Sequence, residues 1–118
     1  MPSELVRRLC RLPAEFKATR TKSMIALLVE SGYLESDGLI SADEIKAELS
    51  RSSGLVDAWF NYSQDQRSSS GWYVIEHGPG NYEVGLVPAG PREAFTDRLD
   101  ACAAYVARKI AELRKHAV

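Results

Sequence analysis

The segment from Thr21 to Val87 reads as helix, short strand, helix, helix and β-hairpin, an order that few small folds use. Its clearest part is the hairpin. Two runs rich in aromatic and β-branched residues, Trp72–His77 and Tyr82–Val87, flank the turn formers Gly78-Pro79-Gly80-Asn81. The order predicts an α+β fold in which several helices pack against an antiparallel ribbon.

Local capping signals divide the helical part of this segment. The first helix begins at Thr21, a suitable N-cap, and ends near Gly32, which suits a left-handed C-cap. A stub of strand is expected at 39–40. The next helix opens with a capping box, in which Ser41 caps the backbone and Glu44 reaches back three residues later.

The third helix is predicted from Ser53 to about Gln64 and has two contrasting faces. Its inner face is apolar at helical spacing: Leu55, Val56, Trp59, Phe60 and Tyr62. Its outer face carries Asp57, Asn61, Gln64 and Asp65. We expect Trp59, and Trp72 in the following strand, to pack in the core rather than to form a stacking pocket for a base.

Two further helices are expected outside this segment, at 3–12, where Pro13 would close the helix, and at 91–116. The second has an uninterrupted apolar seam: Phe95, Leu99, Cys102, Val106, Ile110 and Leu113. Such a seam predicts a homodimer interface, which we prefer, or a helix that covers its own domain. The chain then divides into an extension (1–20), a central domain (21–88) and a C-terminal helix (91–118).

The composition is that of an ordinary globular domain, since 45% of the 118 residues are hydrophobic and 26% are charged. Cys10 and Cys102 have no paired spacing, which favours free thiols in a reducing, cytoplasmic compartment. The N-terminal residues include Arg7, Arg8 and Arg11 but no apolar run typical of a signal peptide. No membrane partner is expected, because no window approaches the roughly 20 apolar residues of a spanning helix.

The net charge of −1 hides an uneven distribution. Residues 1–22 contain six basic and two acidic side chains, whereas residues 30–48 contain six acidic side chains and one basic. A phosphate backbone responds to the charge of one face rather than to the total. The distribution therefore permits a basic face, with solvated helix surfaces as the plainer interpretation.

The element order of 21–88, with its Trp72-Tyr73…Tyr82 hairpin, resembles the winged helix-turn-helix superfamily. The resemblance implies a winged-helix core with added N- and C-terminal helices. It also implies that the helix from Ser53 enters the major groove and that Gly78 to Asn81 forms the tip of the wing. Its expected partner is double-stranded DNA, and its expected role is that of a small dimeric transcriptional regulator.

The resemblance also assigns residues to DNA. The expected base readers are Ser53, Asn61 and Gln64. The expected contacts to the phosphate backbone and the minor groove are Lys17, Arg20, Lys22, Arg67, Ser68 and the wing residue Asn81.

An alternative function follows from the acidic residues. Asp57 and Asp65 on the reading helix would repel phosphate, which favours a protein-interaction module or accessory subunit. Its acidic face would consist of Glu35, Asp43, Glu44, Glu48 and Asp57. No catalytic residues, metal ligands or cofactor are expected. Glu76 and His77 are adjacent on a strand, point to opposite faces and so form no dyad, and the sequence has no glycine-rich phosphate loop, His-x-x-x-His pair or nucleophile elbow.

Overall fold

The computed structural model describes residues 4–19, 26–27, 42–51, 53–65, 71–87 and 90–117. The helices are α1 (Glu4–Cys10), α2 (Leu12–Thr19), α4 (Ala42–Leu49), α5 (Ser53–Asp65) and α6 (Arg98–Ala117), and the strands are β1 (Gly71–Gly78), β2 (Asn81–Val87) and β3 (Arg92–Phe95). Ala26 and Leu27 are also helical. The expected strand at 39–40 and the expected caps at Thr21, Gly32 and Ser41 lie outside the described residues.

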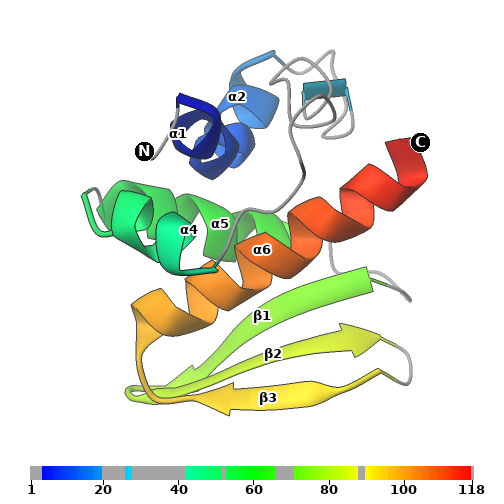
Figure 1. Cartoon of the computed structure of the whole chain (residues 1–118). Helices are drawn as coiled ribbons and strands as arrows, with labels where there is room; N and C mark the ends of the chain where they lie inside the picture. The colour runs from blue at the N-terminus through cyan, green and yellow to red at the C-terminus, as the bar shows by residue number, and fades with distance from the viewer. Residues whose placement is uncertain are drawn as a thin grey trace.

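The helices cover one face of a three-stranded antiparallel sheet of order β1-β2-β3 (Figure 1). Helix α6 lies across this face and contacts all three strands, while α4 and α5 pack beside it. Helices α1 and α2 form the layer farthest from the sheet and rest on α4 and α5. The α+β class is thereby confirmed.

One hydrophobic core joins these layers. It takes fully buried side chains from the N-terminal helices, the central helices, the sheet and α6: Leu9, Leu12, Ile45, Leu49, Trp59, Val74, Val84, Tyr105, Val106 and Ile110. The Trp59 indole Nε1–H donates to the Cys10 carbonyl over 2.9 Å. This bond fixes the end of α1 to α5, so the N-terminal helices belong to the same packed body.

A buried serine attaches α5 to β1. The Ser63 hydroxyl accepts a hydrogen bond from the Val74 N–H (2.9 Å) and donates one to the Val74 carbonyl (3.2 Å). Both backbone groups of a strand residue are thus satisfied by one side chain of a helix. The position of α5 along β1 is fixed as a result.

The predicted hairpin is confirmed. Strands β1 and β2 pair from Gly71↔Val87 to Gly78↔Asn81, with one irregularity between Glu76 and Gly78. Gly80 has a φ of 71° in the connecting turn, a left-handed conformation that glycine adopts without strain.

The predicted N-terminal helix is wrong in its end point. Pro13 does not close a helix over 3–12; it lies in the first turn of α2, which follows α1 after a single junction residue, Arg11. A proline is tolerated there because the first N–H groups of a helix have no intrahelical partner.

The predicted start of the C-terminal helix is also wrong. Residues Arg92–Phe95 form β3, which pairs with β2 from Tyr82↔Phe95 to Gly85↔Arg92, so Phe95 is not part of a helical seam. Helix α6 begins only at Arg98, because the Asp97 carboxylate caps it by accepting the Leu99 N–H over 3.4 Å. The winged helix stays a prediction. The winged-helix element order has no strand after the hairpin, whereas this chain has β3 there.

The rest of the α6 seam faces the chain's own core. Cys102, Val106, Ile110 and Leu113 are buried, and Leu99 is partly buried against the same cluster. This arrangement is the alternative in which the helix covers its own domain. A dimer built on these side chains would require them to leave the core.

The two cysteines provide a test of this packing. Burial, with a smaller effect of Glu48, raises the pKa of the Cys10 thiol to about 12, and burial raises that of Cys102 to about 12 as well. At pH 8 each thiolate fraction is then about 1,000-fold below that of an exposed thiol. We expect thiol-specific reagents to label neither cysteine in the folded protein and both in urea, as measured by mass spectrometry. Fast labelling of Cys102 without denaturant would contradict the placement of α6.

Candidate functional site

The exposed face of α5 brings two of the predicted base readers together. Asn61 and Gln64 are both exposed and lie three residues apart, with exposed Asp57 one turn earlier on the same face. Amide side chains with this spacing present donors and acceptors to one surface. The structure therefore places a polar, accessible strip along the outside of the helix.

Asp57 is paired, which changes the electrostatics expected of this strip. Its Oδ1 lies 2.6 Å from the Arg98 guanidinium, which comes from the first turn of α6. Arg98 also stacks over the Phe60 ring, 4.5 Å from the centroid, and lies 3.8 Å from Glu76 on β1. The guanidinium offsets the negative charge of Asp57 only in part, because it is shared with Glu76.

The other predicted DNA contacts are only partly placed. Asn81 is exposed at the start of β2, next to the hairpin turn. Lys17 lies in α2 and Ser53 begins α5, but their side chains lie outside the described part of the chain. Arg20, Lys22, Arg67 and Ser68 are also outside the described residues.

A basic hollow at the α1–α2 junction was not assigned to any ligand from the sequence. Arg7, Arg8, Arg11 and Glu15 line a cavity of about 430 Å³. The Arg7 Nε lies 3.9 Å from Glu48 of α4, and the Arg8 Nη2 lies 3.5 Å from Glu15. A partial sequence signal was present, because residues 7, 8 and 11 would share one face if a single helix ran over 3–12. The structure instead ends α1 at Cys10 and places Arg11 at the junction.

The expected acidic face does not form one patch of unpaired carboxylates. Glu48 is only 6% exposed and lies beside Arg7, and Asp57 is paired with Arg98. Asp43 and Glu44 are exposed on α4, whereas Glu35 lies outside the described residues. The acidic residues are thus distributed over separate contacts.

A cross-strand cluster on the hairpin was missed by reasoning along the chain. The Glu83 carboxylate accepts a hydrogen bond from the Tyr73 hydroxyl, and its other oxygen lies 3.1 Å from His77 Nε2. These two contacts hold the pKa of Glu83 below its usual value, and the hydrogen bond from Tyr73 has the larger effect. The partner of His77 is therefore a residue on the neighbouring strand, and the cluster ties β1 to β2 beside the turn.

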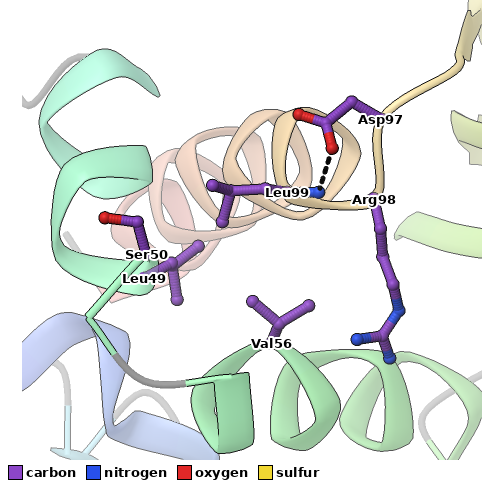
Figure 2. Close-up of a pocket in the computed structure, with 6 residues that line it drawn as sticks. All are labelled: Leu49, Ser50, Val56, Asp97, Arg98 and Leu99. Carbon is purple, nitrogen blue, oxygen red and sulfur yellow. Dashed lines mark hydrogen bonds between the residues drawn. The ribbon is translucent and has the colours of Figure 1, made fainter.

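A small apolar pocket lies where α4, α5 and α6 meet (Figure 2). It has a volume of about 300 Å³ and is lined by Leu49, Ser50, Val56, Asp97, Arg98 and Leu99. Its polar groups already have partners: Ser50 donates to the Ala47 carbonyl over 2.7 Å, Asp97 caps α6, and Arg98 pairs with Asp57. The pocket offers apolar contact without an uncommitted group to orient a ligand.

Two further kinds of site were tested against the described residues. Within them, no three histidine, cysteine, aspartate or glutamate side chains are grouped to hold a metal ion. No helix in the same ranges has the length and apolar character needed to cross a bilayer.

Among the described residues, the amide strip of α5 and the arginine hollow of α1–α2 are two surfaces with accessible groups of defined chemistry. Comparison of the chain with protein-family models, curated proteins and solved structures finds no match.

Proposed function

We propose that this chain binds double-stranded DNA and that α5 reads base edges through Asn61 and Gln64. The observation that carries the proposal is the exposed amide strip of α5, in which Asp57 is ion-paired with Arg98. Asn and Gln side chains pair with the major-groove edge of adenine through two hydrogen bonds. A 13-residue helix anchored along its opposite side is a suitable element to enter that groove.

In this proposal the domain is a winged-helix variant that acts in transcription regulation. Its support is the order α4, α5 and hairpin, with exposed Asn81 beside the turn that would serve as wing tip. Strand β3 is an addition to the winged-helix pattern, and α6 braces the sheet from the helical side.

The alternative function, a protein-interaction module, has narrower support. It would have to use the exposed carboxylates of α4, Asp43 and Glu44, because Glu48 and Asp57 lie beside arginines of the same chain. It becomes the preferred function if the experiment below fails.

The proposal is tested by selecting duplexes from a random pool and comparing the wild-type protein with the double variant Asn61→Ala/Gln64→Ala. We expect the wild type to enrich an adenine-containing site. Each lost bidentate pair should cost about 1–3 kcal/mol, so each substitution should weaken binding to the selected duplex by a factor of roughly 5 to 150. Affinity for unrelated duplexes should change little, because phosphate contacts remain.

A matched control is Thr96→Ala, which removes an exposed polar side chain from the bend between β3 and α6. It should retain the selected site with wild-type affinity. If the folded wild type enriches no sequence, base reading by α5 is rejected. If Thr96→Ala loses as much affinity as the double variant, the amides of α5 are not the readers.

A further inference from the structure

The arginine hollow lies on the side of α1 opposite to the buried residues that anchor this helix. Val6, Leu9 and Cys10 are buried, which turns the opposite side of the helix, with Arg7, Arg8 and Arg11, towards solvent. Arg7 and Arg11 are one helical turn apart, and Arg8 lies between them. The three guanidinium groups are therefore brought together by an anchored helix.

The backbone of the junction is hydrogen-bonded where α1 passes into α2. The Arg11 N–H donates to the Arg8 carbonyl over 3.0 Å, and the Glu15 N–H donates to the Arg11 carbonyl over 3.1 Å. On the far side, Phe16 of α2 packs edge-to-face on Tyr62 of α5, with ring centroids 5.9 Å apart. The hollow is thus fixed to the helix for which we propose base reading.

The arginines differ in what they contact. Arg7 lies beside nearly buried Glu48, and Arg8 lies beside Glu15 at the rim. Exposed Arg11 has no ion-pair partner among the residues that the structure describes. A guanidinium has five N–H donors, so Arg7, which lies beside Glu48, and exposed Arg11 can still donate to an incoming anion. Glu48 and Glu15 each lie beside one guanidinium group, and the three arginines with these two glutamates have a net charge of +1.

From this geometry we infer that the hollow of Arg7, Arg8 and Arg11 binds phosphate groups. Guanidinium groups match the oxygens of a phosphate in paired hydrogen bonds, and the described lining of the hollow holds three of them and one carboxylate, Glu15. A volume of about 430 Å³ admits a phosphodiester segment. The inference rests on the proposed function in one respect: the phosphates would come from the backbone of the same DNA duplex that α5 reads.

The first test uses inorganic pyrophosphate and no DNA. Titration should shift the Nε–Hε signals of Arg7, Arg8 and Arg11 in two-dimensional NMR spectra and reach saturation. Arg11→Gln should abolish this response, and the variant should fold because it breaks no ion pair among the described residues. Arg7 is left intact, since its removal would leave the buried Glu48 carboxylate without its partner.

The matched control is Arg92→Gln, which removes the same charge from an exposed position on β3. It should bind pyrophosphate as the wild type does. Shifts spread without saturation over all arginines, or equal losses in Arg92→Gln and Arg11→Gln, would overturn the inference, because net charge alone would then explain the response.

The second test titrates duplex DNA by fluorescence anisotropy at about 50 mM and about 200 mM salt. One lost phosphate contact lowers the salt slope by about 0.9 and weakens binding roughly eightfold at about 0.1 M salt. We expect this change for Arg11→Gln and none for Arg92→Gln. The Thr96→Ala protein provides an uncharged reference for affinity.

The two tests separate the hollow from the proposed function. Equal duplex binding by Arg11→Gln and the wild type would overturn the hollow as a backbone contact, while base reading by α5 would stand. Pyrophosphate binding without any duplex binding would overturn both the nucleic-acid source and the proposed function. The hollow would then be a site for a free phosphate compound.

Discussion

Val106→Asp should abolish folding of the whole domain. Val106 is fully buried in α6, between the sheet and the other helices, so the substitution places an unpaired carboxylate in the core. The lost apolar burial and the uncompensated charge together cost more than about 5 kcal/mol. A domain of this size has a total free energy of unfolding of only about 5–15 kcal/mol. Circular dichroism should show loss of the cooperative thermal transition.

Ala111→Asp is the matched control for this experiment. It introduces the same carboxylate five residues further along α6, at an exposed position, and should cost about 1 kcal/mol through helix propensity and the helix dipole. Size-exclusion chromatography with light scattering distinguishes a seam that joins two copies of the chain from a seam that packs in the core of one copy. If wild type is a dimer and Val106→Asp is a folded monomer, the seam joins two copies and the core packing described above is incorrect.

Trp59→Ala should cause the second largest loss of stability. The side chain is fully buried, and its ring packs edge-to-face on Tyr62 and Tyr105 at centroid distances of 5.9 Å and 6.0 Å. Truncation leaves a cavity worth about 3–5 kcal/mol, and the Cys10 carbonyl loses its donor at a further cost of about 1–3 kcal/mol. Urea unfolding should show the decrease in the free energy of unfolding, and the melting temperature should fall by more than about 10 °C.

Trp72→Ala serves as the comparison, because Trp72 is only partly buried beneath the Arg108 guanidinium. It should cost about half as much as Trp59→Ala. Trp59→Phe keeps an aromatic ring but removes the N–H group, so its loss should fall between those of wild type and Trp59→Ala. Equal losses for the two alanine variants would contradict the central position of Trp59.

The predictable parts of the fold are those determined by interactions between residues close together in the sequence. The hairpin followed from its turn residues, and α4 and α5 followed from capping signals and apolar spacing, as observed. Strand β3 was missed because four residues are too few to separate a period of two from a period of 3.6. The pairing of β3 with β2 is a contact between strands, which the local sequence of β3 does not reveal. The start of α6 was also missed, because Asp97 was not considered as its N-cap.

The candidate site shows the same division between local and non-local information. The shared face of Asn61 and Gln64 follows from helical spacing alone. The offset of Asp57 by Arg98 does not, because 41 residues separate the partners. The contact between His77 and Glu83 depends on the hairpin register and on the irregularity after Glu76. The arginine hollow required knowledge that the chain begins a new helix immediately after Arg11.

The contact between Ser63 and Val74 has a consequence for how the protein behaves in a crowded solution. Strand β1 is the first strand of the described sheet, and an unpaired strand edge can recruit a strand from another chain and so begin aggregation. The serine hydroxyl occupies both backbone groups of Val74 that an incoming strand would need. At the opposite edge, β3 is only four residues long and begins with exposed Arg92 and Glu93. A helix at one edge and charge at the other thus discourage intermolecular β-pairing.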